Sequence, residues 1–223
     1  MCISWLRSSI GKKALMAVSG LVLVGFIISH LLGNLLIFSG ADALNAYGAK
    51  LRHLGWLLWA ARVFLIVAVG VHITTSLQLA IENRRARPQR YQVQRYAETS
   101  LTARAMLVSG GLVLAYLVYH LLHFTFRVTN PEVSHGVDAL GRHDIYTMVV
   151  RSFQQPPIAL AYIAGMACVC LHLGHGVASA FQTLGLTTER TIPVLGWISR
   201  LFALAVFLGY CAIPVAVLSG IIQ

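Results

Sequence analysis

The sequence predicts an all-α membrane protein with five transmembrane helices in one bundle: an antiparallel four-helix core and a fifth, peripheral helix. Of its 223 residues, 57% are hydrophobic and 11% are charged, whereas a soluble domain carries about 25% charged residues. Five apolar stretches also reach the roughly 20 residues that a membrane-spanning helix needs. They lie at about 14–39, 60–82, 105–127, 157–185 and 198–221.

The connections between these stretches are short, so we expect residues 1–223 to form a single transmembrane domain. The apolar runs are continuous, which excludes the alternating strands of a membrane β-barrel. The first stretch follows the basic residues Arg7, Lys12 and Lys13, as a secretory signal would. Its apolar run of about 25 residues is longer than the 7–15 of a signal segment, and we expect it to be retained as the first span.

Each of the first four spans has one histidine that we take as its mid-span candidate, and the fifth has no histidine. The four are His30, His72, His120 and His172. Ionisable side chains inside a membrane are rare and usually functional. Four imidazoles on four helices match two sites with two axial nitrogen ligands each, which is the ligand set of two bis-histidine b-type haems. Such haems transfer electrons and leave no position open for oxygen.

Spans one and three share a pattern that aligns their histidines. The tripeptides Val18-Ser19-Gly20 and Val108-Ser109-Gly110 precede His30 and His120 by the same spacing, and a Leu-Leu pair follows each histidine. The repeat makes His120 the counterpart of His30. A small Ser-Gly pair in a span lets a bulky group or another backbone approach closely.

The depth of each histidine decides how the four pair. At a rise of about 1.5 Å per residue, His30 and His120 lie roughly 6–7 Å from the middle of their spans, toward the same surface. His72 and His172 lie near the middle of theirs. We therefore expect His30 to pair with His120 nearer the outer surface, and His72 with His172 nearer the inner surface. Each pair joins two parallel helices, which puts these helices at opposite corners of the core.

The basic residues indicate the orientation of the chain. Eleven of the 17 lie on the side of the N-terminus: Arg7, Lys12, Lys13, Arg84, Arg85, Arg87, Arg90, Arg95, Arg104, Arg190 and Arg200. The other side has Lys50, Arg52, Arg62, Arg127, Arg142 and Arg151. The positive-inside rule then places the N-terminus in the cytoplasm and the C-terminus outside the inner membrane. The basic face suits anionic lipid headgroups, and it also suits a docked acidic partner.

Other interpretations of the histidines stay open at this stage. A histidine in a span often serves helix packing, and proton relays and transporters also use intramembrane histidines. Relays and metal transporters usually add intramembrane acids, whereas here Glu82 only marks an inner edge. His123 and His175 follow His120 and His172 by one turn, on roughly the same helix faces, so either could replace its neighbour as a ligand.

Several residues near the span ends could support such a site. Cations could pair with haem propionates or extend to the lipid headgroups. The candidates are Arg62, Arg127 and Arg151 on the outer side, and Lys12, Lys13, Arg84 and Arg104 on the inner side. Three further histidines are expected to be solvated in outer loops: His53, His135 and His143. Residues 144–153 mix apolar and polar side chains and predict a surface helix that covers the outer site.

Longer segments around the histidines indicate a family. They are Gly11-Lys12-Lys13, Ser19-Gly20 and Ser29-His-Leu-Leu-Gly-Asn34 in the first span, Ala43-Leu-Asn-Ala-Tyr47 in the first outer loop, Tyr119-His-Leu-Leu-His-Phe124 in the third span, and Leu171-His-Leu-Gly-His-Gly176 with Thr183-Leu-Gly-Leu-Thr187 around the end of the fourth. Over essentially its whole length, the chain resembles the di-haem cytochrome b membrane-anchor subunit of the succinate dehydrogenase/fumarate reductase family.

The resemblance implies a subunit that anchors a flavoprotein and an iron–sulfur protein to the cytoplasmic face and passes electrons between them and membrane quinone. It implies axial haem ligands at His30, His72, His120 and His172, paired first with third and second with fourth, and no dicarboxylate site in this chain. No nucleic-acid partner is expected.

The resemblance leaves the direction of the reaction and the quinone site open. Ser19, His175 and Arg84, near the inner surface, are candidates for quinone contacts. The first outer loop offers only Asp42 as a carboxylate, so no outer quinone or proton site is assigned there. Two alternatives remain. One is a di-haem cytochrome b subunit of a hydrogenase or formate dehydrogenase, and the other is a haem-free transporter or structural bundle.

Overall fold

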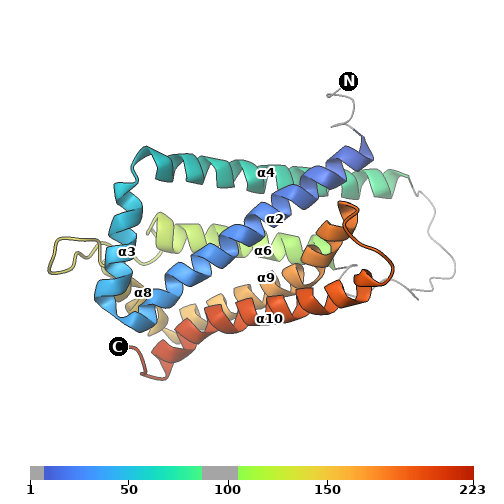
Figure 1. The fold of residues 1–223 in the computed structure, drawn as a ribbon. Helices are drawn as coiled ribbons and strands as arrows, with labels where there is room; N and C mark the ends of the chain where they lie inside the picture. The colour runs from blue at the N-terminus through green and yellow to red at the C-terminus, as the bar shows by residue number, and fades with distance from the viewer. Residues whose placement is uncertain (1–7, 87–104) are drawn as a thin grey trace.

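The computed structural model describes residues 8–86 and 105–223; it is 82% helical and has no strand in these ranges. Five helices are long and apolar enough to cross a membrane, so the chain is a multi-pass membrane protein and the predicted fold class is confirmed (Figure 1). The spans are α2 (Ser9–Asn34) with the 3-10 helix η1 (Leu35–Ser39), α4 (Trp56–Arg85), α6 (Met106–His120) with the π-helical turn η2 (Leu121–Thr125), α9 (Pro156–Thr183) and α10 (Thr191–Leu218).

Local capping moves several span ends away from the predicted positions. The first span starts at Ser9, before residue 14, because the Ser8 side chain accepts a hydrogen bond from the N–H of Gly11 (3.1 Å) and caps the helix. The fifth span starts at Thr191, before residue 198, since Pro193 lies in the first turn, where a missing N–H costs nothing. Hydropathy alone underestimates α2 because its first residues include Ser9, Lys12 and Lys13.

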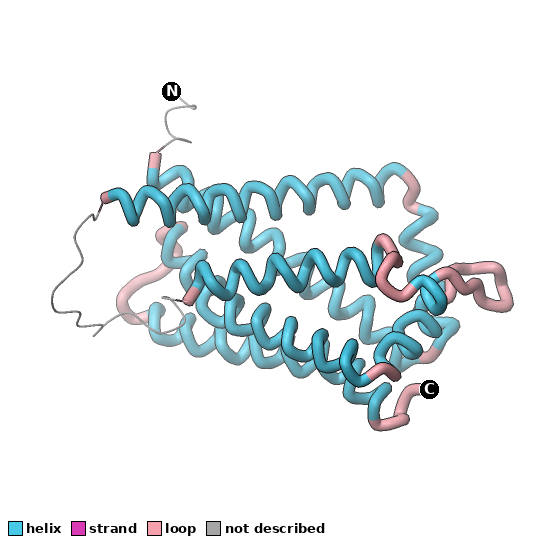
Figure 2. The backbone as a smooth tube through the Cα atoms, turned by 180° about the vertical axis from the view of Figure 1, so that it is seen from behind, coloured by secondary structure: helices cyan, strands magenta, loops and turns pink. Residues whose placement is uncertain are grey.

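Four helices surround the histidines in the order α4, α2, α9, α6. Helix α2 packs against α4 on one side and α9 on the other, and α6 packs against α9, whereas α4 and α6 make no extensive contact. The parallel helices α2 and α6 therefore occupy opposite corners, as do α4 and α9 (Figures 1 and 2). Helix α10 packs along α9 and touches α2 from outside this core, in the place predicted for the fifth span.

The two ends of the bundle differ in structure. We call the end at Ser9, Arg85, Met106, Thr183 and Thr191 the basic end, and the opposite end the capped end. The cap consists of α3 (Ala41–His53), α7 (Pro131–Ser134), α8 (Ile145–Phe153) and the loops that join them.

Helix α3 corrects the expectation of a loop after the first span, and α8 forms where the surface helix is predicted. Helix α3 is amphipathic and buries Leu44, Asn45 and Gly48. The side chain of Asp144 caps α8 by accepting from the N–H of Thr147 (3.0 Å).

Asn45 ties the parts of the cap together. Its side chain is 1% exposed, and its amide oxygen accepts hydrogen bonds from the backbone N–H groups of Ile145 (2.9 Å) and Tyr146 (3.0 Å). Its amide nitrogen donates to the carboxylates of Asp144 (3.1 Å) and Asp138 (3.3 Å). One polar side chain therefore joins α3, the start of α8 and the loop before it.

The cap also holds His143, which corrects the expectation that this residue is solvated. His53 and His135 are exposed, but His143 is half-buried. Its Nδ1 donates to the carbonyl of Gly136 (3.1 Å), and its Nε2 accepts from the guanidinium of Arg127. Burial first, and the charge of Arg127 second, lower the pKa of His143. The imidazole is therefore held in its neutral form.

Candidate functional site

The structure brings the four predicted histidines together as two pairs inside the bundle. The ring centroids of His30 and His120 are 5.9 Å apart, with planes at 82°, and those of His72 and His172 are 6.3 Å apart, with planes at 77°. These are the pairs that the depth of each histidine predicts. In α2, Gly20 lies against His72 of α4, and His30 follows Gly20 by ten residues. The two pairs are therefore separated by about 15 Å along the helix axis.

Ser109 orients the imidazole of His172. Its hydroxyl donates to the carbonyl of Met106 (3.1 Å) in the same helix, and its oxygen lies 3.0 Å from Nδ1 of His172. Because the hydroxyl proton is already used, the oxygen accepts the Nδ1–H of His172. The other ring nitrogen, Nε2, then has the lone pair, which is what a metal needs.

His72 is held in a similar way by α2. Its Nδ1 lies 3.1 Å from the carbonyl oxygen of Met16 and 3.5 Å from the hydroxyl of Ser19. A carbonyl only accepts hydrogen bonds, so Nδ1 of His72 has the proton and Nε2 the lone pair. Metal-binding histidines usually donate their second N–H to such a partner, which fixes the tautomer and the orientation of the ring.

The Ser-Gly pairs of the repeat are the points where these two histidines meet a neighbouring helix. A Cβ atom at Gly20 would lie 3.2 Å from Cε1 of His72, and one at Gly110 would lie 3.4 Å from Cε1 of His172. Glycine therefore lets each imidazole lie directly against the backbone of the preceding span. The repeat predicts a close approach at these positions, and the group that approaches is the histidine of the next span.

The separation within each pair is compatible with one metal atom between two imidazoles. With a metal–nitrogen distance of about 2.0–2.1 Å and about 1.1 Å from nitrogen to ring centre, two rings on opposite sides of a metal have centroids about 6.3 Å apart. The measured values are 6.3 Å and 5.9 Å. Within the described ranges, the Nδ1 hydrogen bonds of His72 and His172 go to other groups and not to each other. Each pair therefore has two imidazoles at a centroid distance close to that of two rings on one metal atom.

Aromatic side chains surround the pair at the capped end. Phe26 stacks on His30 with ring centroids 5.3 Å apart and planes at 13°. Tyr210 of α10 lies 6.2 Å from His30 and donates its hydroxyl to the carbonyl of Ile27 (2.8 Å). The rings around His120 are those of Tyr116, Phe124 and Tyr162, at centroid distances of 5.8 to 6.2 Å. The peripheral helix thus contributes to this pair through Tyr210, a contact that the sequence does not predict.

The two pairs differ in how their rings are oriented. Nδ1 of His120 is buried and has no hydrogen-bond partner in the part of the chain that the structure describes. The pair at the basic end is held by hydrogen bonds from α2 and α6, and the pair at the capped end is held by ring packing.

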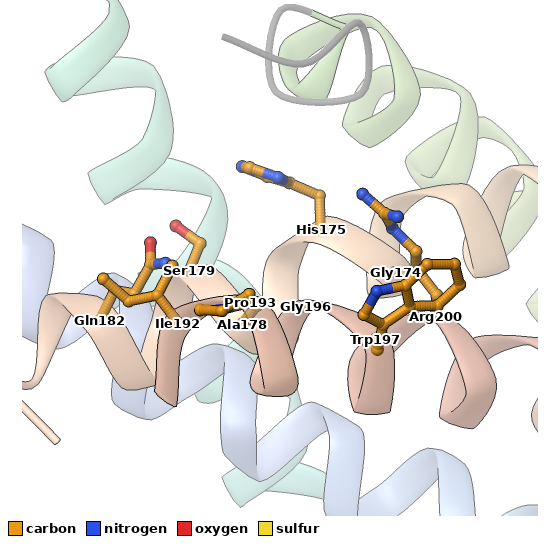
Figure 3. Close-up of a pocket in the computed structure, with 10 residues that line it drawn as sticks. All are labelled: Gly174, His175, Ala178, Ser179, Gln182, Ile192, Pro193, Gly196, Trp197 and Arg200. Carbon is orange, nitrogen blue, oxygen red and sulfur yellow. The ribbon is translucent and has the colours of Figure 1, made fainter. Parts of the chain in front are cut away.

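His123 and His175 are not members of either pair. His123 is fully buried in the π-helical turn η2, with its Nδ1 3.0 Å from the hydroxyl of Tyr162 and its ring stacked on Phe124 (4.1 Å). The rings of His120 and His123 both contact Phe124 and Tyr162, but the ring that lies next to His30 is that of His120. His175 lines a separate cavity between α9 and α10 (Figure 3). The geometry favours His120 and His172 as the ligands.

The cations predicted to meet haem propionates have other surroundings. The guanidinium of Arg62 lies 4.9 Å from the Trp59 ring centroid, and Lys12 forms an ion pair with Glu82. Arg127 binds His143 and the carbonyl of Ser134 (3.3 Å). Lys13, Arg84 and Arg151 are exposed. Arg104, like Arg7, Arg87, Arg90 and Arg95 of the basic side, lies outside the described residues. We therefore assign no propionate partner.

The three candidates for quinone contacts are not brought together. Ser19 is buried beside His72 and belongs to the support of that ring. His175 lines the cavity between α9 and α10, and Arg84 is exposed near the end of α4.

Each candidate site has only its two imidazoles as protein ligands. In residues 8–86 and 105–223, no group of three or more His, Cys, Asp or Glu side chains could hold a metal ion. No protein family, curated protein or solved structure matches the chain. Inference of function therefore rests on the geometry of the two histidine pairs.

Proposed function

We propose that this chain is the membrane-anchor cytochrome b subunit of a succinate dehydrogenase/fumarate reductase complex and holds two haems b. His72 and His172 would hold the haem at the basic end, and His30 and His120 the haem at the capped end. The observation that supports this most strongly is the presence of two imidazole pairs, each spaced for one metal atom, at two depths of one bundle. A haem with two histidine ligands supplies one-electron transfer and has no position open for oxygen.

The residues around the pairs have roles that follow from their contacts. Ser109 and Met16 accept the Nδ1 protons of His172 and His72, and so keep the Nε2 lone pairs available. The aromatic rings around His30 and His120 pack against the two imidazoles and orient them. Two one-electron centres at different depths would let electrons pass between the basic end and the capped end of the membrane.

The basic end is the proposed docking surface for the flavoprotein and iron–sulfur subunits, on the cytoplasmic side by the positive-inside rule. Lys12 is paired with Glu82 there. The remaining described cations of this end form no ion pair within the described residues: Lys13, Arg84, Arg85, Arg190 and Arg200. Such a surface attracts an acidic protein partner. Succinate would react on the flavoprotein, and this chain would exchange electrons with quinone.

The first test is the haem content of the purified native complex. A dithionite-reduced minus oxidised spectrum with a pyridine haemochrome assay should give two haems b per copy of this chain. One haem would mean that one pair is structural, and no haem would overturn the proposal. Co-purification of a flavoprotein with an iron–sulfur protein supports the succinate enzyme. Co-purification of a hydrogenase or formate dehydrogenase subunit would instead support the alternative respiratory complex.

Single substitutions then test the pairing. His30→Ala and His120→Ala should each remove only the capped-end haem, and His72→Ala should remove only the basic-end haem. His123→Ala is the matched control, because His123 is bonded to Tyr162 and lies outside the pair. If His123→Ala lost a haem while His120→Ala kept both, the assignment of the ligand would be wrong.

A further inference from the structure

A cavity of about 320 Å³ opens between α9 and α10 at the basic end, apart from both histidine pairs (Figure 3). Its polar lining comes from both helices: His175, Ser179 and Gln182 from α9, and Trp197 and Arg200 from α10. Gly196 contributes no side chain and has no atom within 4 Å of the position of a Cβ. The cavity therefore offers space for a small polar group at the level where a span meets the membrane surface.

The polar side chains of this cavity are available to a ligand. Within the described residues, His175, Ser179 and Gln182 make no side-chain hydrogen bond and Arg200 makes no ion pair, including with Glu189 of the adjacent loop. The guanidinium of Arg200 lies 5.3 Å from the ring centroid of Trp197. In Figure 3 this guanidinium and the His175 imidazole extend to the same side of the two helices. The site thus presents one positive charge and several donors.

An exposed apolar stripe continues from the cavity along α10. Trp197, Leu201, Leu204 and Leu208 lie on one helix face and are 64%, 62%, 52% and 59% exposed. They follow one another at the spacing of one helix face and cover about 16 Å along the span. A ligand with a polar head and an apolar chain could use both features at once.

We propose that this cavity binds the headgroup of one anionic glycerophospholipid. The phosphate would lie on Arg200 with donors from Ser179, Gln182 and His175, and an acyl chain would follow the stripe from Trp197 to Leu208. Arginine suits phosphate because its planar donors match the phosphate oxygens, and basic cavities between spans bind such headgroups. Free phosphate shares the headgroup chemistry but makes no use of the stripe. This site is independent of the haem proposal.

The test measures quenching of Trp197 by brominated lipids in vesicles that contain the full chain. Replacing Trp5, Trp56 and Trp59 by Phe leaves Trp197 as the only indole. Brominated phosphatidylglycerol is compared with brominated phosphatidylcholine, with and without excess inorganic phosphate. Phosphatidylcholine has the same phosphate but adds a quaternary ammonium group, which places a second positive charge near Arg200. We therefore expect a preference of about tenfold for phosphatidylglycerol, equivalent to about 1.4 kcal/mol.

Variants separate this site from the general charge of the basic end. Arg200→Gln should abolish the preference and Arg200→Lys should restore part of it, with unchanged helix content by circular dichroism. Arg190→Gln removes a charge of the same end outside the cavity and should keep the preference. Equal losses in Arg190→Gln and Arg200→Gln, or no preference in the parent, would overturn the proposal. Displacement of the lipid by inorganic phosphate would identify a free-phosphate site instead.

Discussion

Replacing Ser109 by alanine should change the potential of one haem and leave the other unchanged. The Ser109 oxygen, at 3.0 Å, is the only hydrogen-bond partner of Nδ1 of His172 in the described part of the chain. This bond raises the basicity of the ligand, which stabilises oxidised iron more than reduced iron. In the proposed cytochrome, Ser109→Ala should therefore raise the midpoint potential of the basic-end haem.

The size of this shift follows from the energy of one hydrogen bond. A net hydrogen bond contributes about 0.5–1.5 kcal/mol, and about 1.4 kcal/mol corresponds to 59 mV for a one-electron couple. The midpoint potential of the basic-end haem should therefore rise by about 20–60 mV. Ser19→Ala is the matched comparison and should shift the potential less. His72 keeps the Met16 carbonyl at 3.1 Å, which is nearer than the Ser19 hydroxyl at 3.5 Å.

The assay is a redox titration of the purified complex, followed by the absorbance of the two haems. The capped-end haem should not move in either variant, because the pairs lie about 15 Å apart along the helix. A larger shift in Ser19→Ala than in Ser109→Ala would refute this account of the hydrogen bonds. A fall of the potential in Ser109→Ala, or a shift of the capped-end haem alone, would also refute it.

Three further predictions concern stability. Gly165→Ala should lower the stability of the folded protein by about 1–3 kcal/mol, because the new Cβ would lie 2.2 Å from the ring of Tyr116. Gly176→Ala is the control, because its Cβ would meet only the flexible terminal methyl group of Met106 at 3.8 Å. Equal thermal unfolding temperatures of the two variants would contradict the reasoning. Asn45→Ala should lower the stability by about 1–3 kcal/mol, since the N–H of Tyr146 loses its acceptor, whereas that of Ile145 keeps the carbonyl of His143 (3.0 Å); an unchanged rate of proteolysis in the cap would count against this. Burial first, and Arg127 second, lower the pKa of His143 in the folded protein. The contribution of neutral His143 to the stability is therefore complete above the unfolded pKa of about 6.5, and it is lost as the pH falls below that value. Amide exchange of residues 128–145, corrected for intrinsic rates, should therefore accelerate from pH 7.5 to pH 5.5, and a His143→Gln variant with the same acceleration would assign it to another group.

The spans and the pairing could be predicted from the sequence because both depend on local properties. A continuous apolar run defines a span, and the fixed rise of a helix converts residue number into depth. These two rules are enough to match His30 with His120. They say nothing about which face of one helix meets which face of another, so the contact of Ser109 with His172 was not predicted, although the repeat singles out Ser109.

The parts that were not predicted depend on contacts between distant segments or on weak local signals. Helix α3 mixes polar and apolar residues, and its buried face consists of Leu44, Asn45 and Gly48. This face can be identified only from its contacts with the rest of the cap. Tyr210 meets Ile27 across 183 residues of sequence. The π-helical turn η2, which sets the position of His123, has no sequence signature that distinguishes it from a regular helix.

The equivalent contacts at Gly20 and Gly110 show how far the two halves of the core repeat one another. In each half, the Ser-Gly pair of one span touches the histidine of the next, and each histidine pair takes one ring from each half. A two-helix protein like residues 8–86 would contain all the required groups once two copies associated about a two-fold axis. The chain departs from this symmetry, because α2 packs on α9 whereas the equivalent helices α6 and α4 make no extensive contact. Helix α10 packs on α9 and has no counterpart in the first half. The repeat therefore relates the histidines and the Ser-Gly pairs, while the packing around them differs between the halves.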